Sequence, residues 1–185
     1  MGTVMKRLLL MLAALAVAMP SVAHAAPATY TAPYQAGSKG GDVFNAVYAD
    51  APSGRILVVR ANPAGLSTGL GCTGQGGYAN FFQPHTATGT VHSVTVNYDV
   101  SLVDPYSWIH VGVKQNGRYI DSIDHPGITA GPGNVVVPLD PTPDGRIAAP
   151  VTGLITIEFG IQVSSACPNI DGGGAQFTSV VVDES

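Results

Sequence analysis

Charged residues are scarce in this sequence of 185 residues, of which Asp, Glu, Lys and Arg together make up 11%. The 12 acidic residues outnumber the 8 Lys and Arg residues, so the formal net charge at pH 7 is −4. An acidic chain of this kind lacks the clustered Lys and Arg that bind a phosphate backbone, and we therefore expect no nucleic-acid partner. Glycine and proline are frequent instead, with 23 and 14 copies, as is typical of exported β proteins with many turns.

Long apolar runs are also few, and one of them stands out: LLLMLAALAVAM at residues 8–19. Two basic residues precede it, and PSVAHA follows, with Ala23 and Ala25 at the small-residue positions of a signal-peptidase site. The run is shorter than the roughly 20 residues that cross a bilayer. We therefore expect residues 1–25 to be a secretory signal peptide. The mature chain would begin at Ala26, be secreted and have no membrane span.

Cysteine occurs only twice, as Cys72 and Cys167, and neither belongs to a C-x-x-C pair. In an oxidising compartment an isolated pair predicts one disulfide rather than a metal or redox site. A closed loop of about 100 residues would stabilise the fold by at most about 4.7 kcal/mol through chain entropy. We expect this bond to fasten a single domain at 26–185, a length that allows a substantial core.

Helical periodicity is nearly absent after residue 25, and two-residue alternation takes its place. The clearest run, SVTVNYDVSL at 93–102, alternates apolar and polar residues, and WIHVGVK and LITIEFGIQVSS do the same. Asn116-Gly117 is the preferred pair for a two-residue hairpin turn, and Pro138 marks an edge strand. Strands are expected at 43–50, 55–61, 78–83, 93–102, 108–114, 119–124, 134–139, 154–165 and 175–184. GITAGPGN at 127–134 and LDPTPDGR at 139–146 are expected to be turns.

One-sided alternation predicts two antiparallel sheets packed face to face, an all-β sandwich, and we expect jelly-roll topology. The stretch TATGTVHSVTVNYDVSLVDPYSWIHVGVKQNGRYIDS and the closing AQFTSVVVDES resemble a galactose-binding-like jelly roll, as found in many carbohydrate-binding modules. In that family a long mid-chain strand and a hairpin precede a final strand of the form aromatic-x-x-hydrophobic. The resemblance covers most of the mature chain and implies a sugar-binding or adhesion role.

Several polar and aromatic residues fall on the outward positions of the predicted strands. If these strands are neighbours, their outward faces combine an aromatic ring with a carboxylate, an amide and an imidazole, which are the groups that a sugar site needs. The glycine-rich loop at 61–77 and Tyr78 are candidates for the rim of such a site, although we favour the alternative that the glycines only serve tight turns near the disulfide. The alternative is that Trp108 packs under a loop above an ordinary solvated sheet face. The candidate ligand-binding residues are Trp108, His110, Glu158, Gln162, Asn97 and Tyr78.

Metal-binding patterns are weak. The five histidines show no zinc spacing, and no EF-hand loop is present. Three groups of residues with side-chain oxygens are candidates for a structural calcium site, so this possibility stays open. Asx residues before glycine, however, commonly only form turns. We otherwise expect no cofactor. The three groups are Asn169 with Asp171, Asp121 with Asp124 and His125, and Asp140 with Asp144.

The leading functional hypothesis is a non-catalytic domain that binds carbohydrate, a cell-wall polymer or another extracellular polymer. A structural or protein-interaction sandwich is the first alternative. The second is a polysaccharide-active enzyme with Glu158 and His110 as the acid/base pair, which would require another carboxylate within about 5–10 Å of Glu158. No G-x-S-x-G elbow or phosphate-binding glycine motif is present. The ligand and the oligomeric state stay open.

Overall fold

The computed structural model describes residues 26–41, 45–60, 75–103, 107–164 and 172–185. These contain eleven strands: β1 (Ala28–Tyr30), β2 (Gln35–Gly41), β3 (Asn45–Asp50), β4 (Arg55–Arg60), β5 (Gln75–Thr86), β6 (Val91–Leu102), β7 (Ser107–Gln115), β8 (Arg118–Pro126), β9 (Gly131–Pro138), β10 (Leu154–Ser164) and β11 (Gly172–Glu184). The signal peptide, both cysteines, Asn169 and Asp171 lie outside the described residues, so the predictions about them stay predictions. The described residues contain no helix, and hence none long and apolar enough to cross a membrane.

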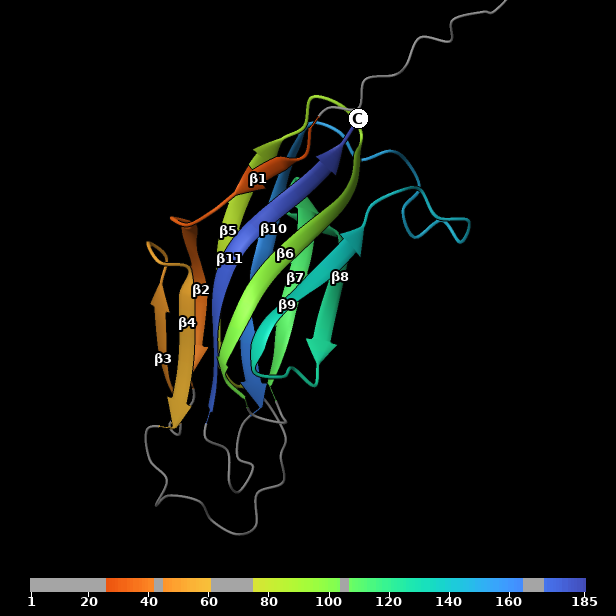
Figure 1. Ribbon diagram of the computed structural model, residues 1–185. Coiled ribbons are helices and arrows are strands. Elements are labelled where there is room, and N and C mark those ends of the chain that lie inside the picture. Colours follow the sequence, from red (N-terminus) through yellow and green to blue (C-terminus); the bar gives the residue numbers. More distant parts are fainter. Residues whose placement is uncertain (1–25, 42–44, 61–74, 104–106, 165–171) are drawn as a thin grey trace, which may run out of the picture.

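The strands form two antiparallel sheets packed as a sandwich (Figure 1). Sheet A has the order β3-β4-β11-β6-β9, with β1 paired to the end of β11, and sheet B has the order β2-β5-β10-β7-β8. Within these sheets, β4 to β11 follow the orders β4-β11-β6-β9 and β5-β10-β7-β8, which is the arrangement of an eight-stranded jelly roll. The predicted all-β sandwich is confirmed.

The core lies between the sheets and consists of the apolar set of each alternating strand. In β10 the inward residues are Ile155, Ile157, Phe159, Ile161 and Val163, each at most 1% exposed. The inward residues of β7 and those of β6 from Val94 to Val100 are also buried, which confirms the predicted facing, whereas Leu102 at the end of β6 is only half-buried. Because successive side chains of a strand point to opposite faces, a buried inward set fixes Glu158 and Gln162 on the outer face of sheet B.

The connections also follow the local sequence. Asn116 and Gly117 have positive φ values of 52° and 77°, as a type I′ turn requires, and they join β7 to β8. The predicted edge strand is confirmed, because β9 ends sheet A and carries Pro138 at its last position. Part of the predicted turn at 127–134 was wrong, however, because β9 already begins at Gly131 and pairs there with Val100.

The sequence reading undercounted the strands, since β1 and β2 were not predicted. β2, with the sequence QAGSKGG, carries little apolar character, and its residues are exposed or half-buried. It forms only because the edge of β5 offers hydrogen-bonding partners, and the register of the β2–β5 pair shifts between Ala36 and Lys39. A strand that depends on its neighbour in this way leaves almost no hydrophobic pattern in the sequence.

Candidate functional site

The outer face of sheet B holds most of the predicted site residues in one register. Across β5, β10 and β7, Tyr78 stands opposite Gln162, and Gln162 stands opposite Trp108. In a neighbouring row His110 of β7 stands opposite Asp124 of β8. Since paired residues of an antiparallel sheet point to the same side, these side chains form one continuous surface across the strands.

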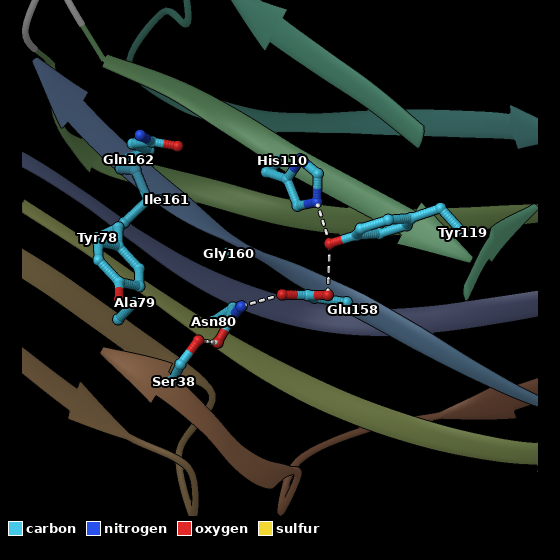
Figure 2. A pocket seen from close by; sticks show the side chains of 10 residues that line it. All are labelled: Ser38, Tyr78, Ala79, Asn80, His110, Tyr119, Glu158, Gly160, Ile161 and Gln162. Carbon is cyan, nitrogen blue, oxygen red and sulfur yellow. Dashed lines mark hydrogen bonds between the residues drawn. The ribbon is translucent and has the colours of Figure 1, made fainter. Parts of the chain in front are cut away.

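A hollow of about 230 Å³ opens on this face (Figure 2). Its lining residues come from all five strands of sheet B, with one of them, Tyr119, on the edge strand β8. Figure 2 shows Glu158 and Asn80 in its centre, His110 and Tyr119 on one side, and Tyr78 with Ser38 on the other. The lining residues are Ser38, Tyr78, Ala79, Asn80, His110, Tyr119, Glu158, Gly160, Ile161 and Gln162.

Glu158 is the anchor of this hollow and is only 6% exposed. Its carboxylate accepts hydrogen bonds from Asn80 Nδ2 and, at 2.7 Å, from the Tyr119 hydroxyl, and it forms an ion pair with Lys114. Burial alone would raise the pKa of Glu158, but the hydrogen bonds from Lys114 and Tyr119 and the charge of Lys114 outweigh burial and lower this pKa below its ordinary value. The group is therefore a fixed carboxylate at neutral pH.

Tyr119 gives the hollow an aromatic wall that is 49% exposed. Its hydroxyl is fixed on Glu158, and Lys114 Nζ lies 4.4 Å from the centre of its ring. The ring reaches Glu158 across Gly112, where a Cβ atom would lie 2.4 Å from Tyr119 Cε1. The absence of a side chain at position 112 thus makes room for the ring, and the hydroxyl bond holds it in place.

His110 links this wall to β8. Its Nδ1 lies 2.7 Å from Asp124 Oδ1, and its Nε2 lies 3.4 Å from the Tyr119 hydroxyl. If Nδ1 carries the proton that the Asp124 carboxylate accepts, Nε2 presents a lone pair on the side of the hollow. The Tyr119 proton goes to Glu158, so this lone pair stays available to a ligand hydroxyl.

The row formed by Tyr78, Gln162 and Trp108 differs from the network around Glu158. None of the three side chains makes a hydrogen bond within the part of the chain that the structure describes. The ring of Tyr78 lies over Gly40 of β2, where a Cβ atom would approach it to 2.8 Å. The outer face therefore has two parts. The polar groups around Glu158 are hydrogen-bonded to one another, whereas the side chains of Tyr78, Gln162 and Trp108 have donors and acceptors that are free to bind a ligand.

The structure thus brings Tyr78, His110, Glu158 and Gln162 together at the hollow. Trp108 is half-buried on the same face beside Gln162, but it does not line the hollow. Asn97 lies on β6 in the other sheet, where its Nδ2 donates to Ser179 Oγ at 2.9 Å. It is not brought together with the other candidates.

Sequence reasoning missed Asn80, Lys114, Tyr119 and Ser38. Asn80 donates to Glu158 and accepts from Ser38 Oγ at 3.2 Å, and so extends the network to β2. The hairpin signal could have found Tyr119, because Asn116-Gly117 places residues 114 and 119 near each other on paired strands. Its contact with Glu158 could not be inferred without the strand order.

Four of the candidate calcium ligands, all of them aspartates among the described residues, are engaged by other side chains. Asp121 is 8% exposed and accepts from Arg146 Nη1 at 3.2 Å, while Asp124 pairs with His110. Asp140 lies 2.6 Å from His92, and Asp144 accepts from Thr142 at 2.5 Å. Among the described residues, no three His, Cys, Asp or Glu side chains are grouped to hold one metal ion.

Two further histidine clusters lie away from the hollow. His85 is buried between Tyr30, at 2.6 Å, and Glu184, at 3.2 Å, and it joins the ends of β1, β5 and β11. On the surface, His92 Nε2 lies 2.6 Å from Ser185 Oγ and its Nδ1 lies 2.6 Å from Asp140, the order of a Ser-His-Asp triad.

Acyl transfer needs N–H donors for an oxyanion in addition to such a triad. The backbone N–H groups of Thr90 and Ser185 beside this cluster are bonded to each other's carbonyl oxygens. We therefore interpret the surface cluster as a structural link between the chain end and the loop before β6.

Known proteins resemble this chain only distantly. No protein-family model matches the sequence, and no curated protein matches it. Solved structures to which the chain is similar include a CBM61 module in complex with β-1,4-galactotriose, at 13% identity and a TM-score of 0.39, with 80% of this chain and 88% of that chain covered. The xylan-binding module CBM15 shows 11% identity and a TM-score of 0.42, with 86% and 98% covered.

A CBM36 domain of a multidomain xylanase from the hindgut metagenome of Trinervitermes trinervoides gives the same identity, TM-score and coverage as CBM15. All three structures have TM-scores below 0.5. Similarity of this degree transfers no function, so the site is judged on its own side chains.

Proposed function

We propose that this protein is a carbohydrate-binding domain and that its ligand lies on the outer face of sheet B. The observation that carries the proposal is the half-exposed ring of Tyr119, held by its hydroxyl on the buried Glu158 beside a polar hollow. A ring with a fixed orientation offers the flat apolar surface on which the C–H face of a sugar stacks, and it loses little conformational entropy when it does so.

Hydrogen bonds to the ligand would come from the groups that the protein leaves unpaired. These are the Tyr78 hydroxyl, the Gln162 amide and the Trp108 indole N–H. His110 Nε2 is also available, because the Tyr119 hydroxyl that lies 3.4 Å from it donates its proton to Glu158. Together they supply both donors and acceptors, as a neutral hydroxyl-rich ligand requires. Glu158 is a positioning residue in this scheme, because its oxygens are already occupied by Asn80, Lys114 and Tyr119.

The hollow is smaller than the roughly 300–1,000 Å³ of typical small-molecule pockets, so only part of a ligand would enter it. Tyr78 and Trp108 lie two strand spacings apart, about 10 Å at the usual 4.7–4.9 Å per strand. We therefore propose that the ligand is an oligosaccharide or polysaccharide chain that crosses the strands. A signal peptide at residues 1–25 would bring the domain to such polymers outside the cell.

A hydrolase is the weaker candidate for this face. A general acid needs a raised pKa, and the pKa of Glu158 is lowered by its hydrogen bonds and by Lys114. The residues that line the hollow include no carboxylate other than Glu158. Glycoside cleavage usually needs two carboxyl groups, so the second one would have to lie outside the residues that line the hollow.

The experiment is a titration of the purified protein with a panel of neutral oligosaccharides and polysaccharides, with and without calcium, followed by Trp108 emission and by calorimetry. We expect saturable binding of one glycan class. Tyr119→Ala and Gln162→Ala should each weaken it about tenfold, the loss of roughly 1.4 kcal/mol of stacking or hydrogen bonding. Tyr48→Ala is the matched control, because Tyr48 is also exposed but lies on sheet A. A flat response across the panel, or equal losses in all three variants, would refute the proposal.

A further inference from the structure

The imidazole of His110 stands at the edge of the hollow with one nitrogen fixed and the other open (Figure 2). Its side chain is 24% exposed, and its Nδ1 lies 2.7 Å from Asp124 Oδ1. Because a carboxylate only accepts hydrogen bonds, Nδ1 carries a proton. In the neutral ring the other nitrogen, Nε2, therefore has no proton and can only accept a hydrogen bond.

The surroundings of Nε2 leave this acceptor unused. The Tyr119 hydroxyl lies 3.4 Å away, but it donates its proton to Glu158 Oε2 at 2.7 Å. A Cβ atom at Gly112 would lie 3.3 Å from Nε2, so the glycine at this position leaves the nitrogen uncovered. An open acceptor on the wall of a hollow is satisfied only when a ligand brings a donor to it.

The charges around His110 also allow its protonated form. Two of the neighbouring groups are carboxylates, and the one cation among them is already paired with Glu158. Burial raises the pKa of Glu158, whereas hydrogen bonds from Lys114 and Tyr119 and the charges of Lys114 and His110 lower it, so His110 and Glu158 are electrostatically coupled. Histidine side chains commonly change charge between about pH 5 and pH 8. The titratable groups facing this side of the sheet are, besides His110, Lys114 of β7, Tyr119 and Asp124 of β8, Glu158 of β10 and Tyr78 of β5.

Protonation of Nε2 reverses its role, because the nitrogen then donates. The oxygen of the Tyr119 hydroxyl, 3.4 Å away, is an acceptor for this proton. A continuous chain of hydrogen bonds then runs from Asp124 through His110 and Tyr119 to Glu158. In this form the cluster satisfies its own groups, and a ligand hydroxyl that donated to Nε2 loses its acceptor.

We propose that neutral His110 accepts a hydrogen bond from one hydroxyl of the glycan through Nε2, and that protonation of this nitrogen in mild acid releases the glycan. The inference rests on the proposed function, since it gives one residue of that site a specific role. His110 thus selects a sugar unit that presents a free hydroxyl at this edge over one that presents only an ether oxygen. Because a single proton is involved, the affinity falls by at most about tenfold per pH unit.

The test measures binding by calorimetry at about pH 8 and about pH 5, with neutral oligosaccharides of galactose, xylose, glucose and mannose as probes. Urea titrations at both pH values establish that the protein stays folded. We expect the Kd to rise about tenfold or more from the higher to the lower pH. His110→Gln keeps an amide oxygen that can accept, so its Kd should change less than about twofold.

Nuclear magnetic resonance of the His110 ring nitrogens reports the proton positions independently of any ligand. At about pH 8 we expect a proton on Nδ1 and none on Nε2. His125→Gln is the matched control for calorimetry, because it removes an exposed histidine from the same strand. His125 stands opposite Ile109, whose side chain is buried between the sheets, so it does not share the outer face with His110. This variant should keep the pH dependence of the native protein.

The outcomes separate this inference from the proposed function. Absence of glycan binding at both pH values would refute the proposed function, and this inference with it. A glycan that binds equally well at both pH values, or a proton on Nε2 at the higher pH, would overturn only the role of His110. So would a pH dependence that disappears in His125→Gln as fully as in His110→Gln.

Discussion

The ion pair between Lys114 and Glu158 allows a sharp prediction, because its two members are buried to different degrees. The Glu158 side chain is 7% exposed and that of Lys114 is 23% exposed. Lys114→Met removes the counter-charge and leaves a carboxylate without its cation in a buried position. Glu158→Gln removes the carboxylate and leaves an ammonium group that can reach water through its flexible stem.

The expected costs differ accordingly. Removing one partner of a fully buried pair costs about 3–5 kcal/mol, and the partial exposure of Lys114 reduces this to about 2–4 kcal/mol for Lys114→Met. Glu158→Gln loses charge-assisted bonds but keeps an amide for Tyr119, so about 1–2 kcal/mol is expected. The free energy of unfolding from urea titration at about pH 7 measures both values.

The cost of Lys114→Met should also depend on pH, and the pKa of Glu158 sets the direction of this dependence. In the native protein the lowered pKa of Glu158 stabilises the fold above the ordinary value of 4.5, and this contribution is lost as the pH falls through the lowered folded pKa. In Lys114→Met, burial dominates and the folded pKa of Glu158 rises, so protonation relieves the penalty. The destabilisation by Lys114→Met should therefore shrink between about pH 7 and about pH 4.5. Equal costs for the two variants, or a difference that does not change with pH, would refute this reasoning.

Three other predictions follow from single contacts. Gly112→Ala places a Cβ atom 2.4 Å from Tyr119 Cε1, so it should displace the ring, weaken glycan binding about tenfold in calorimetry and lower stability by about 1 kcal/mol. Burial would raise the pKa of Glu184, but hydrogen bonds from His85 and Thr88 outweigh burial and lower this pKa. The free energy of unfolding should therefore decline as the pH falls below about 4.5. Glu184→Gln should make this decline smaller in urea titrations. Ser185 should not be labelled by a fluorophosphonate, and labelling that disappears in His92→Ala would show a catalytic cluster instead.

The strands of the interior were predictable because burial leaves a one-sided pattern in the sequence. The inward sets of β7 and β10 could be read directly, and with them the outward positions of His110, Glu158 and Gln162. The hairpin between β7 and β8 followed from Asn116-Gly117, whose positive φ values few other pairs adopt.

The site itself could be predicted only in part, because it depends on which strands are neighbours. The placement of β10 between β5 and β7 brings Asn80 and Lys114 to Glu158, and no local pattern encodes that order. Asn97 shares the outward alternation of the other candidates, but its strand belongs to sheet A.

The most direct test of carbohydrate binding on sheet B is to map amide chemical shifts by nuclear magnetic resonance during titration with the neutral glycan panel. We expect progressive shifts concentrated in β5, β7, β8 and β10 around Tyr78, His110, Tyr119 and Gln162, with β3 and β4 unchanged. Shifts confined to other surfaces, or none for any glycan at saturating concentration, would contradict the placement of a carbohydrate site on this face.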